Sequence, residues 1–381
     1  MSLEWKTVEL KSIANVTMGQ SPKSEFYNDN FEGMPFLQGN KTFGDKYPSF
    51  ELYTTSIKKV AEKNSVLMSV RAPVGDLNIA QEDICIGRGV CGLQMKKGDN
   101  EFLYYLLKAN ISHLINKESG TVFGSINKND IETFEVTLPE DSEDQQKILT
   151  ILKNIDKKIE VCKDLNKNLY GILLNCFNEI FDHEEKNCKL SDIVNIRRGA
   201  SPRPIKDYIS DAGINWLKIS DVTWTEMPFI YKIKEKIIEK GKSKSVFIEK
   251  GTLVVSNSAT PGIPKFIMVD TCVHDGWLVL NKYGDNLRYY LYFLIVKIRR
   301  ELINLAYGSV FNNLKTDTLK NYEISKPTDD QLDKFNKMAY PIMEKIDSNT
   351  KEIMMLSKLR DTLLPKLMSG EIDVSKINCD L

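Results

Sequence analysis

The sequence lacks several features that would place the chain in a common class. It has only three histidines and seven cysteines, and no C-x-x-C pair, so its pattern contains no metal-ligand cluster. No apolar run reaches the roughly twenty residues that a membrane helix needs. Basic and acidic residues both number 52, so no net charge draws the whole chain to nucleic acid. These absences predict a cytoplasmic protein with reduced thiols, no membrane contact, and basic groups that act only locally.

Common catalytic motifs are missing as well. The sequence contains no Walker-type phosphate loop, no H-E-x-x-H and no G-x-S-x-G. A G-x-G-x-x-G pattern does occur within Ile86–Gly92, but a short strand-like run and a turn follow it instead of a helix. This context predicts a turn and not a dinucleotide site. We identify no catalytic or metal-binding residue, so the sequence gives an enzymatic function no support.

The second half of the chain repeats the first. Six residues between Leu10 and Pro22 recur 180 positions later, between Leu190 and Pro202. Four further blocks recur in the same order at offsets between 180 and 188. A unit of about half the chain is too long for a solenoid repeat, so the duplication predicts two homologous domains.

Each copy follows the same predicted plan. Strand-like runs such as 66–70 and 252–256 precede turns that contain proline and glycine. A helical stretch comes next, at 101–115 in the first copy and 286–305 in the second. A long helix then closes each copy.

Both closing helices carry apolar residues three and four positions apart, as coiled coils do. The predicted helix seam consists of Ile155, Ile159, Asn166, Leu169, Ile346, Asn349, Ile353 and Leu356. Because the seams are narrow and flanked by charged residues, we expect the two helices to pair with each other, antiparallel. Asn166 and Asn349 then meet near the middle and fix the register. Pro341 predicts a break or a kink, which leaves an intact stretch of roughly 35 Å from Ile342 to Leu364, and Pro365 predicts an end or a bend.

Polar and basic residues gather at equivalent turns of the two copies. Arginine, lysine, asparagine and glutamine read base edges, and lysine and serine contact phosphates. The candidate DNA-binding residues are Gln20, Ser21, Lys23, Gln38, Asn40, Lys41, Arg71 and Arg88 in the first copy, and Arg197, Arg198, Ser201, Arg203, Lys218, Ser220, Lys242, Lys244, Asn257, Ser258, Asn312 and Lys315 in the second. Equivalent loops differ in chemistry, which is the pattern of two readers of different short sequences. For any single one of these residues, an ordinary solvated surface is the safer interpretation.

With these features the chain resembles the specificity subunits of type I restriction–modification systems over nearly its full length. The matching marks are W-x-x-V-x-L-x-x-I-A from Trp5 to Ala14, the turn Arg71–Gly75, the segment Gly120–Ile131 with its echo Gly308–Leu319, the Leu138–Pro139 lead into a helix start with Gln145, Gln146 and Gln331, and the closing run Leu363–Ile372. The chain departs from the family pattern where Ser258 stands in place of Arg71, so the role of that arginine has no counterpart in the second copy.

The resemblance implies an α+β fold with two homologous α/β target recognition domains in tandem. Two long antiparallel coiled-coil helices separate and join these domains around a pseudo-twofold. The implied boundaries are 1–140 for target recognition domain 1, 141–183 for spacer helix 1, 184–327 for target recognition domain 2, 328–370 for spacer helix 2 with a break near Pro341, and 371–381 for the C-terminal tail.

The resemblance further implies a non-catalytic DNA-reading subunit. Each domain reads one half of a bipartite site in double-stranded DNA, and the helices set the spacer. Two methyltransferase subunits and the restriction (motor–nuclease) subunits are the implied partners, and S-adenosylmethionine belongs to the methyltransferase. Exposed apolar surface would be needed for docking, with Met338, Met343, Met354 and Met355 as candidates.

Two other functions stay open at this point. The chain could be a coiled-coil adaptor with two ligand-binding domains and no role with DNA, or an enzyme with an unrecognised active site at the domain interface. The neutral net charge also predicts weak DNA binding by this chain alone, with most phosphate contacts coming from its partners.

Overall fold

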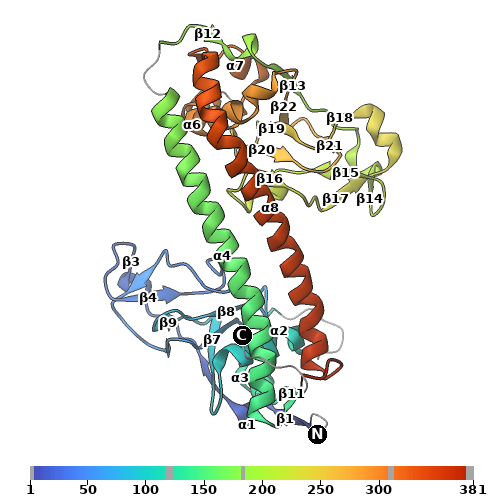
Figure 1. Ribbon diagram of the computed structural model, residues 1–381. Helices are drawn as coiled ribbons and strands as arrows, with labels where there is room; N and C mark the ends of the chain where they lie inside the picture. Colours follow the sequence, from blue (N-terminus) through green and yellow to red (C-terminus); the bar gives the residue numbers. More distant parts are fainter. Residues whose placement is uncertain (1–3, 117–123, 182–184, 308–312, 375–381) are drawn as a thin grey trace. The chain divides into compact units, whose positions relative to one another are not determined.

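The computed structural model combines helices with several small sheets (Figure 1). It describes residues 4–116, 124–181, 185–307 and 313–374. The chain divides into two compact units. Unit 1 comprises Met1–Ile159 and Met355–Leu381, and unit 2 comprises Glu160–Met354. Both limits fall inside the two long helices, so each unit holds part of both helices. The mixed α+β architecture is confirmed.

Unit 1 is built on small sheets and short helices. An antiparallel pair joins β1 (Trp5–Glu9) to β11 (Glu135–Pro139). The first sheet runs in the order β2 (Ala14–Met18), β10 (Val90–Met95), β7 (Val66–Ser69), β8 (Leu77–Ile79). The second runs in the order β3 (Tyr27–Asn28), β5 (Tyr53–Thr54), β4 (Met34–Leu37), β9 (Ile84–Ile86), β6 (Val60–Ala61). Its helices are α1 (Leu10–Ile13), η1 (Ser24–Phe26), α2 (Asn100–Asn116) and α3 (Lys128–Glu132).

Unit 2 repeats this arrangement. Its strand pair is β12 (Cys188–Lys189) with β23 (Glu323–Ile324). The first sheet runs in the order β13 (Asn195–Arg198), β22 (Trp277–Asn281), β19 (Thr252–Ser256), β20 (Pro264–Ile267), β16 (Phe229–Ile230). The second runs in the order β14 (Ile209–Ser210), β17 (Glu235–Ile237), β15 (Ile214–Leu217), β21 (Thr271–Val273), β18 (Val246–Ile248). Its helices are η2 (Leu190–Asp192), η3 (Ile205–Asp207), α5 (Ser220–Thr223), η4 (Glu239–Lys244), η5 (Asp285–Leu287), α6 (Arg288–Tyr307) and α7 (Thr316–Lys320).

The two units therefore share one arrangement of strands, apart from β16, which adds a fifth strand to the first sheet of unit 2, and the predicted duplication is confirmed. Each second sheet has the same parallel pair at its centre, β4 with β9 and β15 with β21. Each first sheet has the same buried serine at the end of its central strand. The Ser69 hydroxyl donates to the Pro73 carbonyl at 2.8 Å, and the Ser256 hydroxyl donates to the Thr260 carbonyl, 2.5 Å away. This matched bond closes the turn that the sequence marks with proline and glycine.

Central strand β7 shows why these short runs are apolar throughout. Successive side chains of a strand point to opposite faces, so both faces of a covered strand must be apolar. Val66 and Met68 join the core that includes α2, whereas Leu67 joins the core of the second sheet. Strand β19 repeats this alternation, with Val254 facing the second sheet of unit 2. Each such side chain stabilises the fold by about 1.5–3 kcal/mol through burial.

The glycine-rich run at Ile86–Gly92 forms the turn between β9 and β10. A strand follows it and not a helix, as the sequence predicts, so the geometry of a dinucleotide-binding loop is missing at this place.

The two long helices are α4 (Ser142–Phe181) and α8 (Asp329–Met368), each of 40 residues. At 1.5 Å per residue each is about 60 Å long. Helix α8 continues through both Pro341 and Pro365. The predictions of a break at Pro341 and of a helix end at Pro365 are therefore wrong. Both prolines lie on the exposed face of α8, as do Lys337 and Asp361 one turn before them. Water can therefore hydrate the carbonyls that lose their partners, which lowers the cost of each proline.

Within unit 2 the helices pair antiparallel and the predicted asparagine contact is confirmed. Asn349 Nδ2 donates to Asn166 Oδ1 at 2.8 Å, and each side chain is 1% exposed. Phe177 meets Phe335 with ring centroids 5.4 Å apart, so higher numbers on α4 face lower numbers on α8. A buried amide pair is satisfied only in one alignment, and it therefore fixes the register. Among the described residues, every helix is too short or too polar to cross a membrane.

Candidate nucleic-acid interface

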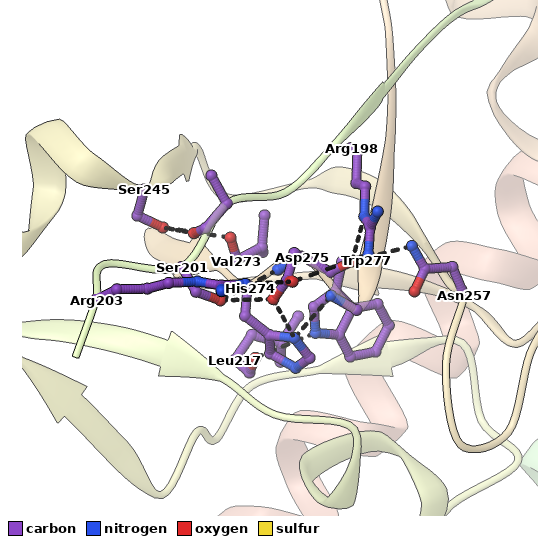
Figure 2. A network of polar contacts seen from close by, with 12 residues as sticks. Arg198, Ser201, Arg203, Leu217, Ser245, Asn257, Val273, His274, Asp275 and Trp277 are labelled. Carbon is purple, nitrogen blue, oxygen red and sulfur yellow. Dashed lines mark hydrogen bonds and ion pairs between the residues drawn. The ribbon is translucent and has the colours of Figure 1, made fainter. Parts of the chain in front are cut away.

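The candidate interface of unit 2 begins where two parallel strands end together. Strands β15 and β21 pair in parallel, with Leu217 opposite Val273. Because parallel strands present their carboxyl ends at one edge, the next residues, Lys218 and His274, lie at the same edge of the sheet. Figure 2 shows the turn after β21 in the middle of a network of polar contacts.

Gly199 brings a third segment against this turn. The segment follows β13, and the Gly199 amide donates to the Trp277 carbonyl at 2.9 Å. A Cβ on Gly199 would lie 2.1 Å from the His274 carbonyl oxygen, so only glycine fits. The equivalent Gly19 would meet the Gly87 carbonyl oxygen at 2.2 Å. The repeated glycine is therefore required by a close backbone approach, and it delivers the following serine to the turn in both units.

Asp275 is the centre of the network in Figure 2. Ser201 Oγ donates to Asp275 Oδ1 at 2.6 Å, and the Asp275 amide donates back to Ser201 Oγ at 3.4 Å. The Asp275 carbonyl accepts from Arg198 Nε at 2.7 Å and from Asn257 Nδ2 at 3.1 Å. Asp275 Oδ2 lies 3.8 Å from Arg198 Nη2 and 3.7 Å from Arg203 Nη2. Hydrogen bonds thus hold the turn, while one carboxylate oxygen and two guanidinium groups face each other at longer range.

The charges of this turn follow from its contacts. The hydrogen bond from Ser201 lowers the pKa of Asp275, and Arg198 acts in the same direction, so the carboxylate is ionised at neutral pH. Burial lowers the pKa of His274, and Lys218 adds to that effect. His274 Nδ1 accepts from the Gly276 amide at 2.8 Å, which requires the neutral ring.

An open pocket of about 630 Å³ lies beside the network. It is lined by Ser201, Pro202, Arg203, Ile205, Trp216, Lys218, Ile219, Ser220, His274 and Asp275. Four of the predicted residues, Ser201, Arg203, Lys218 and Ser220, therefore meet at one place. The ammonium of Lys218 pairs with Glu235 of β17, which leaves the two arginines as the cations next to the carboxylate.

Unit 1 builds the equivalent turn with different side chains. The Arg88 amide donates to Ser21 Oγ at 3.2 Å, as the Asp275 amide does to Ser201. The Gly89 amide donates to the Gln38 carbonyl at 3.2 Å. Arg88 and Gln38 are both exposed beside Ser21, so three of the predicted residues of this copy lie together.

The other candidates of unit 1 each have separate contacts of their own. Gln20 is exposed and fixed through its backbone, whose amide donates to the Ile86 carbonyl at 2.9 Å. Lys23 lies 3.6 Å from Glu25, and Lys41 lies 2.8 Å from Glu51. Asn40 Nδ2 donates to Asp76 Oδ2 at 2.5 Å, and exposed Arg71 forms a backbone bridge with Ser125. The acidic partners reduce the positive charge that these lysines offer to DNA.

In unit 2 several candidates lie away from the pocket. Arg197 Nη2 donates to the Phe247 carbonyl at 3.4 Å, and Lys242 Nζ lies 4.0 Å from the centroid of the Phe247 ring. Lys244 Nζ donates to the Tyr208 hydroxyl at 2.6 Å. These contacts place Arg197, Lys242 and Lys244 in a second basic group next to β18.

The remaining candidates are scattered. Asn257 is 2% exposed, and its amide holds the Asp275 turn from inside. The Ser258 hydroxyl lies next to Gly276, and exposed Lys315 precedes α7. Asn312 lies outside the described residues, as do parts of the matched segments Gly120–Ile131 and Gly308–Leu319. Contact of any candidate with DNA stays a prediction.

Sequence reasoning missed Asp275 and His274 as parts of this site. The signal was present, because Asp275 stands 187 positions after Arg88, a predicted contact residue in the first copy. An acidic residue is unusual among phosphate contacts, so its residue type kept Asp275 out of the predicted DNA-binding residues. In the part of the chain that the structure describes, no group of histidine, cysteine, aspartate and glutamate residues could hold a metal ion.

The predicted docking methionines divide into two pairs. Met343 is fully buried in the core of unit 2, and Met338 packs against that core, so Met343 is wrong as an exposed candidate. Met354 and Met355 are exposed. A second exposed apolar set, which was not predicted, lies on α4 and is formed by Val161, Leu165 and Ile172. Their spacings of four and seven place them on one face of the helix.

Comparison with known proteins gives this architecture a family. The family model of the type I restriction modification DNA specificity domain matches residues 2–170 and 183–358. The type I restriction enzyme MjaIX specificity subunit of Methanocaldococcus jannaschii is 26% identical and covers 98% of this chain and 95% of its own length. A protein of the same organism, provisionally named the MjaX specificity subunit, is 44% identical over 165 residues, which are 42% of this chain and 38% of that relative.

A solved structure agrees at the level of the fold. The crystal structure of the type I restriction–modification system S subunit from M. genitalium matches with a TM-score of 0.60 at 17% identity, and the match covers 96% of both chains. The family model matches most of the chain, once in each half, in the order of the two structural units. The chain belongs to the family of type I restriction modification DNA specificity domains.

Proposed function

We propose that the chain is the subunit of a type I restriction–modification complex that reads the DNA sequence, with one half of a bipartite site read by each unit. The observation that carries this proposal is the pair of equivalent turns. One scaffold holds Ser21 and Arg88 in unit 1 and Ser201 and Asp275 in unit 2, with the same backbone-to-serine hydrogen bond. The side chains at the tips of the two turns, Arg88 and Asp275, carry opposite charges. A fixed scaffold with different tips suits two readers of different half-sites.

The helices have two roles in this proposal. They set the spacer between the half-sites, and they carry two methyltransferase subunits. The exposed set Val161, Leu165 and Ile172 supports docking, because apolar side chains on one helix face need a partner to leave water. S-adenosylmethionine then binds to the methyltransferase and not to this chain, and restriction subunits join the same complex. A cytoplasmic location stays a prediction.

The test is to produce the chain together with its methyltransferase subunit in a host that lacks other methyltransferases. Co-purification reports the partnership, and single-molecule sequencing of host DNA reports the methylated bases. We expect a motif of two short half-sites with a fixed unspecified gap. Replacing residues 1–140 by the same domain of a relative should change one half-site and leave the other half-site and the gap intact.

Two results would contradict this function. A complex that methylates no defined motif, or a motif that changes in both halves on replacement of 1–140, is incompatible with independent readers. No complex and no binding of the chain to DNA at low salt would favour the adaptor, and substrate turnover by the purified chain alone would favour the enzyme.

A further inference from the structure

The two equivalent turns carry opposite charges at the same position. Arg88 and Asp275 each place a backbone amide on a serine hydroxyl, at 3.2 Å and 3.4 Å, so their side chains leave the scaffold from matching places. Arg88 is exposed, and the Asp275 side chain is 41% exposed. Duplication explains the shared scaffold but not an acidic group at the tip of unit 2, since any acid there weakens attraction to phosphates.

The Asp275 carboxylate is arranged as an acceptor with one free direction. Its Oδ1 is held by the Ser201 hydroxyl at 2.6 Å. Its Oδ2 is 3.8 Å from Arg198 and 3.7 Å from Arg203, which is longer than a hydrogen bond. The lowered pKa of Asp275 keeps the group ionised, so it can accept but not donate. Oδ2 therefore retains acceptor capacity, and Asp275 is one of the residues that line the pocket.

Arg198 is the matching donor. Its Nε donates to the Asp275 carbonyl at 2.7 Å, which fixes the guanidinium, and its Nη2 lies 3.8 Å from Asp275 Oδ2, close enough for an ion pair but too far for a hydrogen bond, so the Nη groups can donate to another partner. Arg203 is less constrained, with a side chain 83% exposed. A rigid pair of guanidinium and carboxylate presents donors and an acceptor side by side.

When the guanidinium donates through two adjacent N–H groups with the carboxylate acceptor beside them, the array matches a G·C pair and not an A·T pair. In the major groove a G·C pair shows the acceptors N7 and O6 of guanine next to the N4 amine of cytosine. An A·T pair shows one donor between two acceptors and a methyl group, and a phosphate offers acceptors only, which a carboxylate repels. We propose that Asp275 accepts from the cytosine N4 amine of a G·C pair in the half-site read by unit 2, while Arg198 donates to the guanine of that pair. This inference rests on the proposed function of the chain.

The matched variant is Asp275→Asn. Its side-chain oxygen can still accept from Ser201, and its size is unchanged, but an amide NH₂ group, which donates, replaces the free carboxylate oxygen. We expect the methylated motif to relax at one G·C position of one half-site, with discrimination there falling roughly tenfold or more. The other half-site and the gap should not change. Asp211→Asn is the control, because Asp211 is an exposed aspartate of unit 2 in the turn between β14 and β15.

The experiment is the sequencing assay on the whole complex, with wild type, Asp275→Asn, Asp211→Asn and Arg88→Gln in parallel. Replacement of residues 1–140 assigns each half-site to its unit. Relaxation of one G·C pair in the half-site of unit 2 by Asp275→Asn, with the opposite half-site affected by Arg88→Gln, supports the inference.

Three results would overturn the inference while the proposed function stands. They are a unit 2 half-site without a G·C pair, an unchanged motif in Asp275→Asn, and an equal loss of methylation at all sites with no change of motif. The last result would assign Asp275 to holding the turn only. A wild-type complex without any bipartite motif is a separate outcome, because it removes the proposed function itself.

Discussion

Lys265 is a buried lysine in β20 of unit 2. It is 1% exposed, and its ammonium donates to the carbonyls of Thr225 at 2.7 Å and Met227 at 2.6 Å. The equivalent residue in unit 1 is Asn78, which is equally buried and donates to the Gly44 carbonyl at 2.9 Å. A buried polar side chain thus ties a surface loop to the same strand in both units.

Burial lowers the pKa of Lys265 to about 7, which makes the stability of unit 2 depend on pH. Between that value and about 10.4 the unfolded chain binds more protons at this residue than the folded chain. Stability should therefore rise with pH through this window, by at most about 1.4 kcal/mol per pH unit, and fall as pH returns toward 7.

Urea unfolding of wild type and Lys265→Met at pH 7, 8 and 9 measures this dependence. Tryptophan fluorescence is a suitable signal, since Trp216, Trp224 and Trp277 all lie in unit 2. The wild type should gain stability relative to Lys265→Met as pH rises. The exposed Lys250→Met variant should follow the wild type, and a pH-independent difference between wild type and Lys265→Met would contradict the assignment.

Individual residues also mark how far sequence reasoning extends at this site. The repeat alignment predicts Ser201 and Lys218 in equivalent polar turns, and they do line one pocket. Their proximity depends on the parallel pairing of β15 with β21, which spacing along the chain does not reveal. Asn257 is a prediction that the fold does not favour: its residue type suits contact with a base, but its side chain is buried. Polarity predicts loops, but burial is decided by the tertiary fold.

At the scale of elements, the heptad spacing predicts both long helices and their antiparallel pairing. The spacing continues through Pro341, and it is the local rule about proline that fails there, because that rule takes no account of which face of the helix the residue occupies. The heptad spacing also leaves the partner of Arg360 undetermined, although that residue, four positions after Leu356, continues the seam. In unit 1 Arg360 Nη1 lies 2.9 Å from Asp156 Oδ1, and the Tyr105 hydroxyl donates to Asp156 Oδ2 at 2.5 Å.

This buried charge pair predicts a large loss of stability in unit 1 when one partner is removed. The side chains of Arg360 and Asp156 are 18% and 10% exposed. Burial raises the pKa of Tyr105, and the neighbouring Asp156 adds to the shift, so the phenol stays neutral and donates. Arg360→Met would leave an uncompensated buried carboxylate, and we expect a loss of about 3–5 kcal/mol in urea unfolding.

Replacing all three polar partners, Arg360, Asp156 and Tyr105, separates the cost of an unpaired charge from the cost of altered packing. The triple variant Arg360→Met, Asp156→Leu, Tyr105→Phe should recover most of the lost stability, because no buried charge or unpaired hydroxyl remains. Lys358→Met, an exposed change on the same helix, should stay within about 0.5 kcal/mol of the wild type. A triple variant as unstable as Arg360→Met would show that the pair is not the source of the loss.

At the scale of the whole molecule, the tandem duplication is the feature that sequence alone predicts best. Matching residues in both copies fix the order of strands, turns and helices, and each unit then forms its own core. The second sheet of each unit is harder to predict, because strands such as β5 and β14 have only two residues. Two residues carry no period, so their pairing is decided by neighbours distant in sequence.

The balance of charge in the whole chain leads to a last prediction. Because the chain has 52 basic and 52 acidic residues, its electrostatic field is small at distances beyond a Debye length, which is about 8 Å at physiological salt. Phosphate contacts must then come from local groups, and Arg203, the most exposed cation of the Asp275 turn, is one of them. The isolated chain should bind DNA without a target only weakly at physiological salt, with a Kd of about 10⁻⁴ M, and the methyltransferase should add most of the affinity.

Fluorescence anisotropy across a series of salt concentrations tests this prediction. The slope of log K against log salt should be shallow for the isolated chain, no steeper than about −4, because few phosphates are neutralised. Arg203→Ala should reduce the slope by about 1, whereas Arg300→Ala, an exposed change on α6, should not alter it. Submicromolar binding of the isolated chain to DNA without a target at physiological salt would mean that distributed charge, and not the turns, dominates its contact with DNA.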